Sequence, residues 1–434
     1  MKTTKRAQHA WAMYDWANST YNLVIGTAIF PIFYSSITRG AEDGADGDYV
    51  IFFGEQLKNT EALSYALAFG MFLVCLIAPT IAGLADYLGK KKMFMRGSCY
   101  LGAASCASLY FFDVAHLELS MISIVLACIG FWCSYALYNS FLPEVALPSE
   151  QDKLSARGYS LGYIGSVLLL VINLVMIMVI GISPRWCFVT VGIWWAGFAQ
   201  YTFMHLPERT TGEKFSADVI ANGYRELKGV WNQVKQDYRL HRYLLSFFVF
   251  SMGVQTIMQM ASLFGTKEIE RIDKSGQLVM GLADEQLIGA VLLVQLIAIP
   301  GAVVFAMCSK RLGNLTTLLI ALVVWAAICI AAYLFVHTPV DFYIAAACIG
   351  FIMGGTQSLA RSTYSKFLPQ THDHASFFSF YDVTEKVGLI IGLLSFGFIE
   401  GTFGSMRMSI LALIAFFLIG LLLLLRVPRK ELSN

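Results

Sequence analysis

Polar side chains recur on one face of the first apolar segment of the chain. Spacings of three and four residues place four of them on one side of a helix: Asp15, Asn18, Ser19 and Asn22. Hydrocarbon offers no hydrogen-bond partners, so a polar face within a membrane must meet protein or a water-filled cavity. We expect Asn18, Tyr21 and Asn22 to bind a polar solute. Asp15 lies nearer the start of the segment, where it is either a gating group or a solvated interface residue.

A second set of charged residues lies in an apolar segment near the end of the chain: Asp382, Glu385 and Lys386. Asp382 and Lys386 are four residues apart, the spacing at which an acid and a base pair along a helix. Isolated charges in a membrane are costly, so such groups are paired, solvated or protonated. Two interpretations follow: a structural ion pair, or a site that binds the solute, together with Tyr381, or a coupling proton. Burial favours the protonated form of a carboxylic acid, which makes Glu385 and Asp15 candidates for proton coupling.

Other polar residues extend both predictions. Four amides could hydrogen-bond the solute or join neighbouring helices: Asn139, Gln255, Gln259 and Gln357. Arg157 and Arg361 flank apolar segments on the same predicted side of the membrane as the carboxylates of Glu144 and Asp152. The two arginines have two explanations. They could form breakable ion pairs that close a gate, or they could simply belong to the positive charge that is retained on the cytoplasmic side of the membrane.

The composition of the chain requires a membrane around these residues. Of 434 residues, 57% are hydrophobic and 14% are charged, against about 25% charged in soluble proteins. Twelve apolar stretches are long enough to span a bilayer as helices. They lie near residues 12–37, 61–84, 93–112, 118–142, 158–182, 185–205, 241–264, 285–308, 315–336, 341–361, 376–399 and 407–425.

The twelve segments divide into two sets of six around a charged stretch. We predict an N-terminal bundle over residues 1–206, a cytoplasmic linker with an amphipathic helix over 207–240, and a C-terminal bundle over 241–434. With both termini in the cytoplasm, 23 of the 31 lysines and arginines fall in cytoplasmic segments, as the retention of positive loops requires. A multi-pass protein of the bacterial inner membrane, acting as a monomer, is the expectation.

Several function classes lack support in the sequence. A net charge of +2, with no lysine- or arginine-rich stretch interleaved with aromatic residues, argues against a nucleic-acid partner. The nine cysteines include no CxxC pair, and His372 and His374 have no neighbouring ligands at zinc spacing, so they predict a solvated loop. Phosphate-binding glycine loops and HExxH are absent from the sequence. We therefore expect no metal, no cofactor and no enzymatic activity.

The two sets of six segments resemble each other. Asn139-Ser-Phe-Leu-Pro-Glu144 has a counterpart 226 residues later, Ser365-Lys-Phe-Leu-Pro-Gln370, and a glycine-bearing segment follows each. Such a parallel repeat is found in the major facilitator fold. Gly83-Leu-Ala-Asp86-Tyr-Leu-Gly-Lys-Lys-Lys92 resembles the signature loop between the second and third helices of that superfamily, with tyrosine in place of the usual arginine after the aspartate. The resemblance implies that Asp86 is a conformational latch.

Four further motifs resemble one branch of the major facilitator superfamily, which contains yeast vacuolar amino-acid effluxers and bacterial permeases of unassigned substrate. They are Tyr14-Asp-Trp-Ala-Asn-Ser19, Tyr138-Asn-Ser-Phe-Leu-Pro-Glu144, Ser155-Ala-Arg-Gly158 with Gly162 and Gly165, and Gly354-Gly-Thr-Gln-Ser-Leu-Ala-Arg-Ser362 followed by Phe377-Phe378. The resemblance implies an all-α fold of two six-helix bundles. It also implies a secondary transporter that moves a small polar solute, with amino acids or related metabolites favoured, by alternating access. A non-transporting sensor or subunit and a flippase for lipid-linked solutes are the alternatives.

Overall fold

The computed structural model describes residues 4–38, 49–208, 219–272 and 276–429. These form two compact units, each of which is described by itself. Unit 1 contains Met1–Val145, Leu161–Gly229 and His372–Ser379, and unit 2 contains Ala146–Ser160, Val230–Thr371 and Phe380–Asn434. Residues 209–218 of the predicted linker lie outside the described residues. The predicted domains follow the linear order of the segments, and that division stays a prediction.

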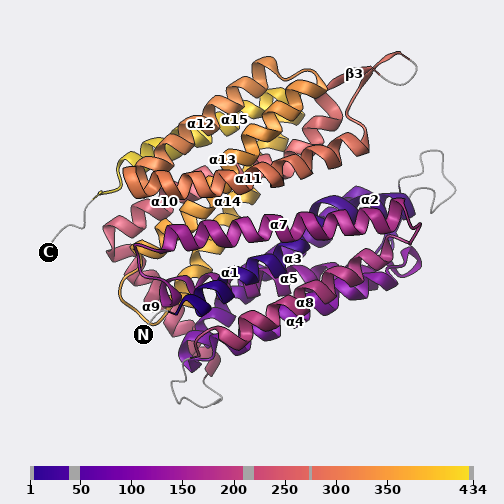
Figure 1. The fold of residues 1–434 in the computed structure, drawn as a ribbon. Helices are drawn as coiled ribbons and strands as arrows, with labels where there is room; N and C mark the ends of the chain where they lie inside the picture. The colour runs from indigo at the N-terminus through magenta and orange to yellow at the C-terminus, as the bar shows by residue number, and fades with distance from the viewer. Residues whose placement is uncertain (1–3, 39–48, 209–218, 273–275, 430–434) are drawn as a thin grey trace. The chain divides into compact units, whose positions relative to one another are not determined.

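Unit 1 is a helical bundle in which α3 lies beside α5 (Figure 1). Its elements are α1 (Lys5–Thr20), the π-helix η1 (Tyr21–Ala28), α2 (Ile29–Thr38), α3 (Asn59–Leu88), α4 (Lys91–Ser108), the short 3-10 turns η2 (Leu109–Phe111) and η3 (Val114–His116), α5 (Leu117–Asn139), α6 (Leu142–Val145), most of α7 (Gln151–Met178), α8 (Arg185–His205) and the start of α9 (Val219–Gln236). Strands β1 (Tyr49–Phe52) and β2 (Glu55–Lys58) form an antiparallel hairpin between α2 and α3.

Unit 2 repeats this arrangement, with α11 beside α13 (Figure 1). Its helices are α10 (Tyr238–Glu268), α11 (Asp284–Leu312), α12 (Asn314–Phe335), α13 (Pro339–Phe367), most of α14 (His374–Phe403) and α15 (Met406–Leu425). A second antiparallel hairpin, β3 (Glu270–Ile272) with β4 (Leu278–Met280), joins α10 to α11. The two hairpins therefore occupy the same place in the two repeats, after the first helix of each.

Each of the twelve predicted segments contains a helix. Within the described residues, ten helices or helix runs have the length and hydropathy of membrane spans. The other two predicted segments are α4, which packs on α5 and α8, and α8, which also packs on α1. The ends differ from the prediction because polar residues continue several helices: α7 begins at Gln151, seven residues early, and α13 runs six residues further, to Phe367.

The first span is interrupted by the π-helix η1. There the Thr27 hydroxyl donates to the carbonyl of Asn22, five residues back, at 2.9 Å. Such wide turns are rare and are found often at functional sites. The sequence pattern did not predict this change of helix type, which immediately follows the polar face of α1.

Glycines let equivalent helices approach closely in both units. In unit 1 a Cβ on Gly165 of α7 would lie 2.7 Å from the carbonyl oxygen of Trp16 on α1. In unit 2 a Cβ on Gly392 of α14 would lie 2.8 Å from the carbonyl oxygen of Met252 on α10. Real Cβ atoms do not come so close, so the fifth helix of each repeat packs on the first through glycine.

Candidate functional site

A buried cluster surrounds Asp86 at the end of α3. Gly89 adopts a left-handed conformation (φ 63°) and turns the chain from α3 into α4. The Asp86 carboxylate accepts hydrogen bonds from the backbone N–H groups of Ala375 (3.3 Å) and Ser376 (2.7 Å) in the first turn of α14. A carboxylate at this position satisfies N–H groups that have no partner within the helix and is attracted by the helix dipole.

Further charged groups complete this Asp86 cluster, which consists of Asp86, Lys91, Glu144 and His374. Lys91, the first residue of α4, donates to Glu144 and lies 3.4 Å from Asp86 Oδ1. His374 Nδ1 lies 3.3 Å from Glu144 Oε1. The prediction that His374 belongs to a solvated loop is wrong, because it opens α14 and its side chain is 13% exposed. One lysine thus joins two carboxylates that are far apart in the sequence.

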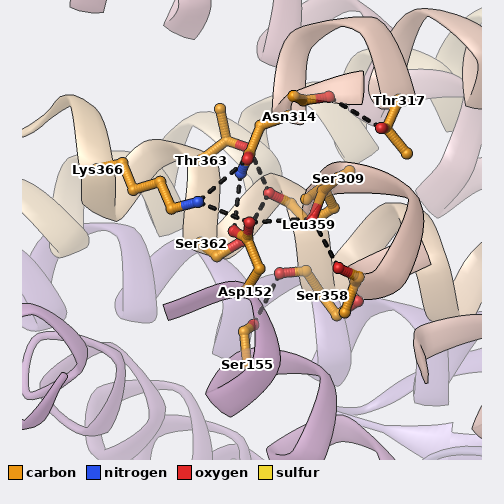
Figure 2. Close-up of polar contacts among 12 residues, drawn as sticks. Asp152, Ser155, Ser309, Asn314, Thr317, Ser358, Leu359, Ser362, Thr363 and Lys366 are labelled. Atoms are coloured by element: carbon orange, nitrogen blue, oxygen red, sulfur yellow. Dashed lines mark hydrogen bonds and ion pairs between the residues drawn. The ribbon is translucent and has the colours of Figure 1, made fainter. Parts of the chain in front are cut away.

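A second buried cluster, in unit 2, surrounds Asp152 in the first turn of α7 (Figure 2). Its carboxylate accepts from Lys366 Nζ (2.6 Å), Asn314 Nδ2 (2.8 Å) and Ser309 Oγ (3.0 Å). Asn314 also donates to Thr363 Oγ1 (2.9 Å) and accepts from Lys366 (3.1 Å). We call Asp152, Ser309, Asn314 and Lys366 the Asp152 cluster. Gly313 (φ 81°) forms the turn between α11 and α12, as Gly89 does in unit 1.

The arginines predicted to gate the transporter differ in burial. Arg361 is 1% exposed; it donates to the Oγ and the carbonyl oxygen of Ser155, each at 3.0 Å, and its guanidinium lies over the ring of Tyr159. Arg157 is exposed. The cation of the Asp152 cluster is Lys366, which no sequence motif indicated. The role of both arginines in gating stays a prediction.

The predicted solute-binding residues of unit 1 have unequal surroundings. Asn18 is 1% exposed, and neither its amide oxygen nor its amide nitrogen has a hydrogen-bond partner among the described residues. Asp15 is buried and accepts from the Tyr138 hydroxyl at 2.8 Å. Tyr21 is buried and stacks on a phenylalanine, whereas Asn22 is exposed. Asn139 is fully buried.

In unit 2 the charged residues of α14 pair differently from the prediction. Lys386 Nζ bonds to Glu385 Oε2 at 2.9 Å, and Gln255 of α10 donates to Glu385 Oε1 at 2.7 Å. The expected ion pair between Asp382 and Lys386 is wrong, because both carboxylate oxygens of Asp382 are buried without a hydrogen-bond partner among the described residues. Spacing along the helix allowed that pair, but the lysine side chain turns to its neighbour.

The remaining predicted residues of unit 2 lie on α10, α13 and α14. Tyr381 is buried between aromatic rings, with its ring centroid 4.1 Å from that of Phe247 and 4.8 Å from that of Tyr364. Gln357 is half-buried and contacts a methionine sulfur, and Gln259 is exposed. Burial thus selects Tyr381 from this group, whereas Gln255 is half-buried, as Gln357 is. Within the described residues, no group of three or more His, Cys, Asp or Glu is arranged to hold a metal ion.

Comparison with known proteins supplies the family. The model of the family described as "Vacuole effluxer Atg22 like" matches residues 3–432. A relative from Bacillus subtilis (strain 168), an uncharacterized MFS-type transporter named YxiO, is 28% identical, with coverage of 100% of this chain and 97% of the relative. Autophagy-related protein 22-1 of Phaeosphaeria nodorum is 22% identical, with coverage of 98% and 89% respectively.

Solved structures show the same fold. The transporter FucP in its outward conformation is similar with a TM-score of 0.70 at 13% identity, over 98% of this chain and 99% of FucP. The proton:xylose symporter XylE, bound to 6-bromo-6-deoxy-D-glucose, is similar with a TM-score of 0.72 at 11% identity, over 98% of this chain and 95% of XylE. The prediction of the major facilitator fold is confirmed, and the chain is an integral membrane protein that crosses the bilayer many times.

Proposed function

We propose that this protein moves a small polar solute across a membrane by alternating access, because the chain belongs to the family described as "Vacuole effluxer Atg22 like". Amino acids and related metabolites are the favoured class, from the resemblance of the sequence motifs to vacuolar amino-acid effluxers. The protein belongs to the MFS-type transporters, and transport rather than catalysis is the function of that superfamily.

The observation that carries this proposal is the amide of Asn18. A buried amide without partners costs about 1–3 kcal/mol in a folded protein, so its retention in a membrane helix calls for a ligand that supplies the missing hydrogen bonds. Asn18 precedes the π-helix η1 by three residues, and its amide offers both donors and an acceptor. A polar solute with both kinds of group, such as an amino acid, satisfies it; an apolar cargo does not.

The Asp86 and Asp152 clusters are proposed as latches of the transport cycle. Each joins the start of a helix, α14 or α7, to the turn between two helices of its unit. Charge-assisted hydrogen bonds can hold one state and release it when water replaces the partners. Proton coupling, through a carboxylate of the membrane segments, is proposed as the energy source.

We place the protein in the bacterial inner membrane with both termini in the cytoplasm. The distribution of positive charge along the sequence supports this orientation. A cysteine introduced at Lys90, in a variant without the nine native cysteines, should react with an impermeant maleimide only after the membrane has been opened. Labelling of this cysteine in intact cells would show that the protein has the opposite orientation.

A thermal-shift screen followed by flux tests the function. Purified protein is heated with amino acids, short peptides, sugars and nucleosides, and each stabilising compound is then tested for uptake into proteoliposomes. Asn18→Ala should abolish the shift, whereas Gln200→Ala, which removes an amide that donates within α8 and accepts from Tyr100, should retain it. A well-folded protein with neither shift nor flux would favour the sensor or flippase alternatives.

A further inference from the structure

Asp382 differs from every other buried aspartate that the structure describes. Four aspartates are buried there, and three have donors: Asp15 from a tyrosine hydroxyl, Asp86 from backbone N–H groups and Asp152 from a lysine, an amide and a hydroxyl. Asp382 is 5% exposed, and neither oxygen accepts a hydrogen bond from the described residues. A carboxylate in such a place calls for a ligand.

Among the described residues, the titratable and charged groups that act on Asp382 come from two helices. On α14, Lys386 and Glu385 act electrostatically on Asp382, but they bond to each other at 2.9 Å. On α13, Arg361 also acts electrostatically on Asp382 while it donates to Ser155. The hydroxyl of Tyr364, on the same helix, interacts electrostatically with the Asp382 carboxylate. Two cations therefore moderate the cost of the anion without donating a hydrogen bond to it.

A cluster of aromatic rings adjoins Asp382. Tyr381, the neighbour of Asp382 in sequence, is stacked between Phe247 of α10 and Tyr364 of α13. Asp382 itself is 5% exposed, so its carboxylate is largely removed from bulk water. A bare carboxylate in a dry site is costly, whereas a carboxylic acid is neutral and needs a single acceptor for its proton.

We propose that Asp382, rather than Glu385 or Asp15, binds and releases the coupling proton, an inference that rests on the proposed transport function. Loading adds one H⁺ to a carboxylate oxygen and gives a neutral acid; release returns the same proton, and only this O–H bond forms and breaks. Glu385 is unsuited to the role because Lys386 and Gln255 already hold its anion. Asp15 likewise has a donor in Tyr138.

Infrared difference spectroscopy tests proton binding without a solute. The purified protein, taken between acidic and alkaline buffer, should show a band of a protonated carboxyl group that Asp382→Asn removes and Glu385→Gln retains. Asp382→Asn should unfold at the same temperature as wild type or higher, because the amide carries no charge. A band that persists in Asp382→Asn, or one lost instead in Glu385→Gln, overturns the proposal.

Flux measurements test coupling. Proteoliposomes clamped at zero membrane potential, with a gradient of one pH unit and a mixture of radiolabelled amino acids, should accumulate label about tenfold if one proton accompanies each solute. Asp382→Asn should reduce accumulation to equality across the membrane while retaining exchange of label. Glu400→Gln, a half-buried change on the same helix that removes only the ion pair with Lys267, should behave as wild type. Proton-driven accumulation that persists in Asp382→Asn overturns the assignment of the coupling proton to Asp382. Absence of transport by the wild-type protein overturns the proposed function. In that case the infrared band still shows whether Asp382 binds a proton.

Discussion

The Asp86 and Asp152 clusters occupy related positions in the two repeats, yet their charges are arranged in opposite ways. In unit 1 the acid lies in the last turn of α3, and the start of α14 supplies backbone N–H donors. In unit 2 the acid lies at the start of α7, and the end of α11 and the start of α12 supply the neutral donors Ser309 and Asn314. Lysines from different elements, Lys91 and Lys366, complete the two clusters.

The difference shows that both repeats keep a polar contact between the start of a helix and a neighbouring interhelical turn, although the residues that form the contact are not the same. A helix start can be held by an acid beyond it or can carry the acid itself, since both arrangements satisfy buried polar groups. Their dependence on individual side chains is unequal. Asp86 shares Lys91 with Glu144, so the lysine keeps a partner when Asp86 is lost. Lys366 has Asp152 as its bonded acid and would lose it altogether.

The largest expected effect is therefore that of Asp152→Ala. Removing one partner of a buried pair leaves Lys366, whose side chain is 20% exposed, with only an amide oxygen, and should lower the free energy of unfolding by about 3 kcal/mol. Titration with SDS in mixed micelles measures this. Glu270→Gln, an exposed acid of the same unit, should change the value by less than about 0.5 kcal/mol. If Asp152→Ala and Glu270→Gln changed the free energy of unfolding equally, the Asp152 cluster would not depend on its acid more than the Asp86 cluster does.

Asp86→Ala should have the second largest effect, a loss of about 2 kcal/mol. The first-turn N–H groups of Ala375 and Ser376 lose their charged acceptor, which is worth about 1.5–3 kcal/mol, while Lys91 keeps Glu144. Asp86→Asn should recover part of the loss because its amide oxygen still accepts from Ser376. The exposed Glu55→Gln is the control in unit 1. A loss larger than that of Asp152→Ala would reverse the proposed order.

The sequence predicted the helices better than the contacts between them. Twelve apolar stretches identify twelve spans because a membrane requires about 20 apolar residues for each, and Asp86 was found because its glycine-flanked turn is a contiguous motif. The Asp152 cluster was missed because Ser309, Asn314 and Lys366 lie more than 150 residues from Asp152, and the first two are ordinary neutral residues. The local similarity of Ser309–Asn314 to the Asp86 turn was the available signal.

Asn314→Ala should have a smaller effect, about 1.5 kcal/mol, because it removes hydrogen bonds to both members of the ion pair but leaves the two charges bonded to each other. Asp152 loses one donor and Thr363 loses another, but the ion pair with Lys366 remains. The unfolding free energy should fall further in Asn314→Ala combined with Ser309→Ala, to roughly the sum of the two single losses. Full retention of stability in that double variant would show that the lysine alone holds Asp152, which would make the two clusters more alike.

His374→Gln should have the smallest effect, about 0.5 kcal/mol, because glutamine can still donate to Glu144 and Lys91 continues to bond it. A double-mutant cycle with Glu144→Gln isolates the pair. His372→Gln, an exposed histidine two residues away, is the matched control and should show no coupling to Glu144. A coupling for His374 that equals that of His372 would exclude it from the Asp86 cluster. The start of α14 would then be held by its backbone alone, which would widen the contrast with unit 2, where side chains hold the start of α7.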